Sequence, residues 1–226
     1  TGEDTLSLHD ALPILIALAL VAASPLASAA ETDSGFYVLA STGPTDTGGR
    51  KAQADTTIRN LGVTTFQSSA DEKDIGYKLQ LGYRINRYVA IEGGYMDLGR
   101  YTYAAAATVP AATRDAKGDI SAWNIGAAGI LPLGQFNLFG KVGVAAYHLK
   151  FHCAGTGIAC VNPDRTSNGN AFHYGLGAEW NFLTHWFVRG EYEVIQKIGD
   201  NLNATGTSGT TSTDLKMVNI GVGYRF

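Results

Sequence analysis

The last nine residues of the chain alternate strictly between apolar residues and polar or small ones. The apolar residues that share one face are Val218, Ile220, Val222, Tyr224 and Phe226. Because successive side chains of a β-strand point to opposite faces, this pattern predicts a strand with one apolar and one polar face. Such a strand suits a barrel that turns apolar side chains toward lipid and polar side chains toward its lumen.

The same alternation recurs along the chain and predicts eight strands. The clearest example runs from Ile75 to Ile85, where tyrosine, leucine and isoleucine alternate with glycine, lysine, glutamine and arginine. The predicted strands lie near residues 35–42, 74–85, 88–98, 119–131, 136–149, 171–182, 186–197 and 214–226. The sequence therefore predicts an all-β fold, an eight-stranded antiparallel up-and-down transmembrane β-barrel, which is the smallest even-numbered barrel of this class.

The connections between these strands alternate in length, as they do in transmembrane barrels with short periplasmic turns and long external loops. The short connections lie at 86–87, 132–135 and 183–185, and the long ones at 43–73, 99–118, 150–170 and 198–213. We expect both ends of the barrel to lie on the periplasmic side and the long loops to be mobile. Aromatic residues crowd the short-turn ends and predict an interfacial girdle: Tyr83, Tyr88, Phe136, Trp180, Phe182, Trp186, Tyr224 and Phe226.

Alternation alone does not decide which face is outside, because a soluble lipocalin-like barrel would turn the apolar face inward. The polar face is rich in glycine and carries both signs of charge, and an Arg or Lys facing lipid costs about 2–4 kcal/mol. The polar face should therefore line a lumen just wide enough for side chains to fill, as a plug with bridging waters. The predicted lumen network consists of Lys78, Arg84, Glu92, Lys141, Glu179, Arg189, Glu191, Glu193 and Arg225.

The amino-terminal segment does not share this pattern. Leu15–Ala30 is apolar but shorter than the roughly 20 residues of a spanning helix, and its small residues at 27–29 suit a secretory cleavage site. Thr1–Ile14 contains no Met, Lys or Arg, and residues 5–14 resemble a translated sequencing adaptor, although an unusual leader is the alternative. We expect a non-native leader at 1–14, a truncated signal peptide at 15–30 and one barrel domain at 31–226.

Charge and cysteine content narrow the function classes. The formal net charge of −3 does not favour binding to nucleic acid. The sequence contains no phosphate loop, nucleotide fingerprint or nucleophile elbow, so no cofactor is predicted. Cys153 and Cys160 lie in the third long connection of an exported chain, which favours a disulfide with a stabilisation of about 2–3 kcal/mol. A zinc site that adds His148 and His152 is the competing interpretation, but the ligand spacing is irregular.

The same two histidines are also candidates for catalytic groups. His148 and His152 lie near the outer end of the fifth predicted strand, where some outer-membrane barrels that modify lipid A carry a His with a Ser. No Ser or Asp stands next to them in a recognisable motif. The sequence therefore predicts that the protein is not an enzyme.

The segment GYKLQLGYRINRYVAIEGGYMDLG, at 76–99, resembles the second and third strands of the OmpA-like transmembrane barrel family. Residues 131–145, 174–182, 188–193 and the ending IGVGYRF follow the same plan, so the resemblance covers essentially all of 31–226. It implies an outer-membrane barrel of a Gram-negative bacterium, with the lumen network given above and with Tyr224 and Phe226 as the signal for the barrel assembly machinery. Full OmpA proteins continue into a peptidoglycan-binding domain, so cell-wall anchoring is not carried over.

Three functions follow as hypotheses from this resemblance and from the residues. The leading one is a structural protein that supports membrane integrity and displays its loops for adhesion or interaction. The second is a narrow, low-conductance porin-like channel for ions or small solutes, and the third is an enzyme that modifies lipid A. The expected partners are outer-membrane lipid and lipopolysaccharide, the barrel assembly machinery, and a host-surface or phage ligand at the loops.

Overall fold

The computed structural model describes residues 34–60, 62–63, 65–108, 111–157, 164–198 and 213–226. The barrel is formed by the unit that ends at Arg225. The elements in chain order are β1 (Gly35–Asp46), α2 (Arg50–Asn60), β2 (Phe66–Asp71), β3 (Lys73–Asn86), β4 (Val89–Thr108), β5 (Ala111–Leu133), β6 (Phe136–Thr156), β7 (Asp164–Asn181), β8 (Trp186–Ile198) and β9 (Thr213–Arg225).

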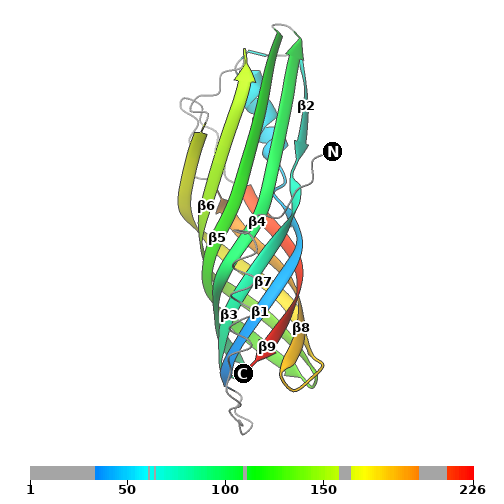
Figure 1. Ribbon diagram of the computed structural model, residues 1–226, viewed down its shortest axis with the longest axis vertical. Helices are drawn as coiled ribbons and strands as arrows, with labels where there is room; N and C mark the ends of the chain where they lie inside the picture. Colours follow the sequence, from blue (N-terminus) through cyan, green and yellow to red (C-terminus); the bar gives the residue numbers. More distant parts are fainter. Residues whose placement is uncertain (1–33, 61, 64, 109–110, 158–163, 199–212) are drawn as a thin grey trace, which may run out of the picture. The chain divides into compact units, whose positions relative to one another are not determined.

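Eight of the strands close into a ring of antiparallel neighbours (Figure 1). The order β4-β3-β1-β9-β8-β7-β6-β5 is completed by pairing between β4 and β5. The first and last strands pair with each other along most of their length, from Tyr37 with Arg225 to Asp46 with Lys216. The predicted eight-stranded antiparallel barrel is therefore confirmed.

The outward face of the barrel is apolar and exposed. On β5 this face runs from Trp123 to Leu133, and both Trp123 and Ile125 are 65% exposed. At about 3.3 Å per residue and a tilt near 40° this stretch spans about 25–28 Å, which matches the apolar band of outer-membrane barrels. Aromatic pairs lie at the short-turn end of the same face, including Phe136 with Trp180 and Trp186 with Tyr224.

The predicted loop at 99–118 is wrong, because β4 and β5 continue through it as a hairpin in which Arg100–Thr108 pairs with Ala111–Asp119. Most of 150–170 is likewise strand, and 43–73 contains α2 and β2. The physical reason is that alternation persists in this region, with Tyr101 and Tyr103 buried between exposed or half-buried neighbours. We call this part the extension: α2, β2 and residues 100–108, 111–119 and 150–156. Figure 1 shows it beyond the ends of β1, β8 and β9.

A β-bulge in β4 directs the strand into the extension. The register of β4 shifts between Asp97 and Arg100, and Gly99 there has a φ of 81°. A Cβ at Gly99 would lie 2.7 Å from the Cβ of Asp74, so the position excludes larger residues. The bulge moves the buried face from even-numbered residues such as Leu98 to odd-numbered ones such as Tyr101, which keeps apolar side chains inside.

The extension also contains a helix, α2, whose carboxyl end is closed by a glycine. Gly62 has a φ of 87°, and its N–H donates to the carbonyl of Arg59 at 2.9 Å, which satisfies one of the unpaired carbonyls at the helix end. Among the described residues, no helix is long and apolar enough to cross a membrane.

Candidate functional site

Two lysines and two glutamates form the centre of the barrel interior. Lys78 Nζ donates to Glu193 Oε2 at 2.8 Å and also pairs with Glu191. Lys141 Nζ lies 2.5 Å from Glu191 Oε1 and pairs with Glu193 as well. His173 Nε2 lies 3.1 Å from Glu193 Oε1. The four charged groups are buried and neutralise one another, as buried charges must.

A second group of ion pairs is organised by Arg189, which joins Glu92 at 2.5 Å and Glu179 at 2.9 Å. Arg84 and Arg225 also pair with Glu179. All nine residues of the predicted lumen network therefore face the interior and join ion pairs, while their role stays a prediction. Sequence reasoning missed neutral partners that share the inward face: Tyr37, which donates to Glu92, Asn137, which donates to Glu179, and Asn219, which donates to Glu193.

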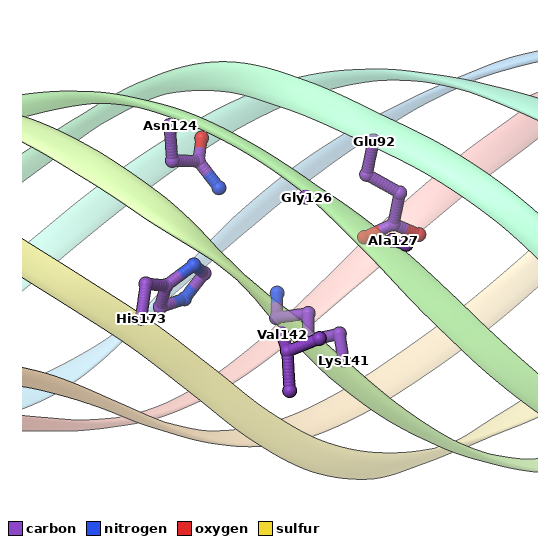
Figure 2. A pocket seen from close by; sticks show the side chains of 7 residues that line it. All are labelled: Glu92, Asn124, Gly126, Ala127, Lys141, Val142 and His173. Carbon is purple, nitrogen blue, oxygen red and sulfur yellow. The ribbon is translucent and has the colours of Figure 1, made fainter.

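A small cavity lies beside this network. Figure 2 shows Glu92, Asn124, Lys141 and His173 around a common space, and they come from β4, β5, β6 and β7. The cavity measures about 10 Å³, which is room for roughly one water molecule. Asn124 Oδ1 is buried without a hydrogen-bond partner among the described residues, so a bridging water is the expected occupant.

Toward the extension, the interior changes from charged to apolar. On β4 the inward side passes from Glu92 to Met96, and on β6 it passes from Lys141 to Ala145. We call the resulting buried cluster the apolar layer: Met96, Leu98, Tyr101, Ile120, Ala122, Ala145, Tyr147, Leu149, Ala171, Ile195, Ile198, Leu215 and Met217. The sequence had predicted only a polar plug, but the inward phase of Leu149 and Met217 relative to the charged residues could have revealed this layer.

At the short-turn end, aromatic rings fill the interior below the charges. Tyr37, Phe139 and Phe187 belong to one buried cluster, and the Arg189 guanidinium lies 4.6 Å from the centroid of the Phe139 ring. A Cβ at Gly82 would lie 2.1 Å from the Tyr37 ring. Glycine is needed at this position because any side chain would overlap the Tyr37 ring.

The extension has a core of its own, in which α2 packs on strand residues with small side chains. Ile58 is fully buried against a wall that includes Tyr103, Ala105 and Ala116. Asp55 fixes the helix there, because Tyr103 Oη of β4 donates to Asp55 Oδ1 at 2.7 Å. Lys51 Nζ, on the helix itself, donates to Asp55 Oδ2 at 2.9 Å. This part of the predicted first loop is therefore a folded unit, while residues 199–212 of the predicted fourth loop lie outside the described residues.

We expect acid to loosen α2. Burial alone would raise the pKa of the Asp55 carboxyl, but hydrogen bonds from Ser68, Tyr103 and Lys51 lower this pKa below its ordinary value. A lowered folded-state pKa means that the stabilisation is present above the ordinary carboxyl pKa, near 4, and is lost as the pH falls below it. Hydrogen exchange of the α2 amides, corrected for intrinsic rates, should therefore accelerate between pH 5 and about pH 3. The Asp55→Asn variant should lack this pH dependence, and an identical profile in both proteins would contradict the assignment.

The outward face changes polarity at the same level as the interior. On β5 it passes from Trp123 to Ser121, and on β6 from Ala146 to His148. These residues are cross-strand partners, Trp123 with Ala146 and Ser121 with His148. We call this level the polarity switch. On one side of it the barrel is apolar outside and charged inside, and on the other it is polar outside and apolar inside, as in a soluble protein.

Two histidines have polar neighbours from adjacent strands. His148 Nδ1 lies 2.5 Å from Asn168 Oδ1, and His152 Nδ1 lies 2.6 Å from Asp164 Oδ1. These neighbours are distant in sequence, so a motif search could not find them. The structure contains no group of three or more metal-binding side chains within its described ranges. Cys153 is buried and is not a free thiol, whereas Cys160 lies outside the described residues, so the disulfide stays a prediction.

Residues 14–226 match the family of the outer membrane protein beta-barrel domain. The chain belongs to this family. It is thus an OmpA-like barrel of the Gram-negative outer membrane. Over 94% of its length it is 28% identical to outer membrane protein A of Yersinia pseudotuberculosis serotype I (strain IP32953). It spans 54% of that relative, so the activity and partners of the longer protein are not transferred.

Solved outer-membrane barrels resemble this family member as well. Ail, the attachment invasion locus protein of Yersinia pestis, is 15% identical, with 87% of this chain and 100% of Ail covered and a TM-score of 0.46. Neisserial surface protein A is also 15% identical, with 85% of this chain and 99% of that protein covered and a TM-score of 0.49. The predicted leader and signal peptide lie outside the described residues and stay predictions.

Proposed function

We propose that this outer-membrane barrel is a non-enzymatic structural protein that supports membrane integrity and displays its extension at the cell surface. The observation that carries the proposal is the contrast between the two ends. The barrel interior is filled by the aromatic cluster, the ion pairs and the apolar layer, while the extension is folded around a core of its own. A filled barrel serves as an anchor, and a folded extension serves as a surface for recognition.

The interior argues against the channel hypothesis. An ion that crossed the barrel would have to separate buried pairs such as Lys78 with Glu193, and breaking a buried pair costs several kcal/mol. It would then have to lose its water at the apolar layer, where Leu149 and Met96 are fully buried. Solute passage would need both barriers to open together.

The extension offers the surface for display. Its outward residues include exposed charges of both signs, such as Arg100 and Asp119, whose side chains are joined at 2.6 Å. The partners we propose for it are host-surface molecules, phage and lipopolysaccharide. We further propose that Tyr224 and Phe226 present the terminal signal to the barrel assembly machinery.

A truncation separates anchoring from display. Arg100 and Asp119 are cross-strand partners, so residues 101–118 can be replaced by Asn-Gly, a turn that closes a two-residue hairpin. We expect the shortened barrel to insert and to migrate differently in boiled and unboiled detergent gels, as the full protein should. We also expect the shortened barrel to restore detergent resistance to a deletion strain. Adherence of that strain to host cells should be roughly tenfold or more lower than with the full protein.

The matched control for this experiment is the full-length protein with Arg114 and Lys117, which both lie in the replaced hairpin, changed to Gln. It distinguishes loss of the folded surface from loss of charge. Adherence of the truncated barrel equal to that of the full protein would refute the display role. Failure of the truncated barrel to restore detergent resistance, despite normal insertion, would refute the separate anchoring role.

A further inference from the structure

A groove of about 200 Å³ lies on the outside of the barrel, across β4, β5 and β6. Besides Ile120, it is lined by Tyr95, Asp97, Asp119, Ser121, His148 and Lys150. The proposed function assigns partners to the extension as a whole and does not say which residues contact a lipid. Its position and its chemistry together indicate what it binds.

The groove lies at the polarity switch. Directly on its apolar side, Tyr95 and Trp123 form an edge-to-face pair with ring centroids 5.3 Å apart, and Trp123 is 65% exposed. On its other side the outward residues of the extension are polar. A molecule in the groove therefore meets the apolar belt at one end and water at the other, which is the environment of a lipid head group.

The lining residues suit a head group that carries both phosphate and hydroxyl groups. Lys150 supplies an exposed ammonium, and Asp119, its cross-strand partner, is already bound through Arg100 Nε at 2.6 Å. Asp97, Ser121 and His148 supply acceptors and donors for hydroxyl groups, and the contact with Asn168 orients His148. A purely anionic head group would be repelled by Asp97, whereas a phosphorylated sugar uses both kinds of group.

We propose that this groove binds the phosphorylated sugar head group of a glycolipid in the outer leaflet, with Lys150 on a phosphate and Asp97, Ser121 and His148 on sugar hydroxyls. The proposal rests on the proposed function, because it needs the barrel to lie in the outer membrane with its extension outside. The bilayer would then hold the lipid tails against Tyr95 and Trp123. A glycolipid bound in the groove would hold the barrel in contact with the neighbouring lipids of the outer leaflet.

The test uses the full protein folded into phosphatidylcholine vesicles with increasing fractions of diphosphorylated lipid A. We expect lipid A to raise the thermal unfolding midpoint, and the fraction that gives half of the shift measures apparent affinity. Lys150→Glu should need roughly tenfold more lipid A, and Lys150→Gln should fall between it and the wild type. Lys216→Glu is the matched control, because Lys216 is exposed at the outer end of the apolar outward run of β9, beyond Val218, and does not line the groove.

Further arms identify the ligand. Dephosphorylated lipid A and phosphatidylglycerol should each shift the wild-type midpoint less than diphosphorylated lipid A, and inorganic phosphate with phosphatidylcholine alone should not shift it. Equal responses to lipid A in Lys150→Glu and Lys216→Glu, or no response in the wild type, would overturn the proposal while leaving the anchoring role intact. Failure of the wild type to insert into any vesicle would overturn the proposed function and this inference together.

Discussion

Replacing Arg189 with alanine is expected to lower the free energy of unfolding by about 3–5 kcal/mol, which is the cost of breaking a buried charge pair. The Arg189 side chain is 2% exposed and pairs with Glu92 and Glu179. Its removal leaves Glu92, whose side chain is 3% exposed, without its nearest cation in the barrel interior. Urea unfolding of the barrel in phospholipid vesicles, followed by tryptophan fluorescence, measures the loss.

The controls for this prediction lie in the same network. Arg225 is 21% exposed and shares Glu179 with Arg84 and Arg189, so Arg225→Ala should cost much less. Arg189→Lys should give an intermediate loss, because an ammonium does not reproduce the fork of a guanidinium that bonds two carboxylates. Equal losses in Arg189→Ala and Arg225→Ala would show that burial of the pair does not govern its contribution.

Planar-bilayer recordings should show no steady current through the wild-type barrel and none through Arg189→Ala. The reason is that the variant removes charge from one barrier and leaves the apolar layer in place, with Leu149 and Met217 still filling the interior. A double variant, Arg189→Ala with Leu149→Ser, should be the first to give steady openings, because it introduces a hydroxyl and a cavity into the second barrier.

The recordings also decide between the display and channel hypotheses. Openings in Arg189→Ala alone would show that the ion pairs are the only barrier, which is what a gated narrow channel requires. Leu149→Ser alone should remain closed, since the pairs of Arg189 with Glu92 and Glu179 are intact. Gel migration with and without boiling establishes that each variant is folded before it is recorded.

The barrel could be predicted from the sequence because the alternation that defines it is a local property of each strand. A strand that faces lipid on one side and a narrow lumen on the other must alternate, and the resulting strands, their order and their inward charges are visible in the letters alone. The presence of charged residues of both signs on one face also indicated which face lies inside, because a charged side chain facing lipid is costly. None of this required knowledge of a contact between distant residues.

The extension was missed because its structure depends on tertiary contacts. The residues of α2, RKAQADTTIRN, have no clear apolar stripe, and the helix is held by Ile58 in a wall of small side chains and by the contact of Asp55 with Tyr103. Residues 104–108 were predicted as part of a loop because four of the five are alanines, a residue type that is depleted in strands. Weak local preference is readily overridden by packing.

The candidate sites divide in the same way. Which charges face the lumen followed from the period of two, but the choice of partner, such as Arg189 with Glu92 across 97 positions of sequence, did not. The groove at Lys150 was invisible because its members come from three strands and become neighbours only through the register of β4, β5 and β6. The alternation within one strand does not show which residues of neighbouring strands lie side by side.

The polarity switch also sets a distance. From Ser121 to Ala111, β5 continues as paired strand, which at about 3.3 Å per residue raises the tip of the hairpin by about 30 Å along the strand. One face of these strands contacts water and the other packs in the core. The barrel therefore cannot move along the membrane normal without exposing apolar residues to water or placing charged residues in lipid. The height of the hairpin above the membrane is therefore set by the length of the paired strands beyond the polarity switch. Changes in the connecting turns alone would not alter it.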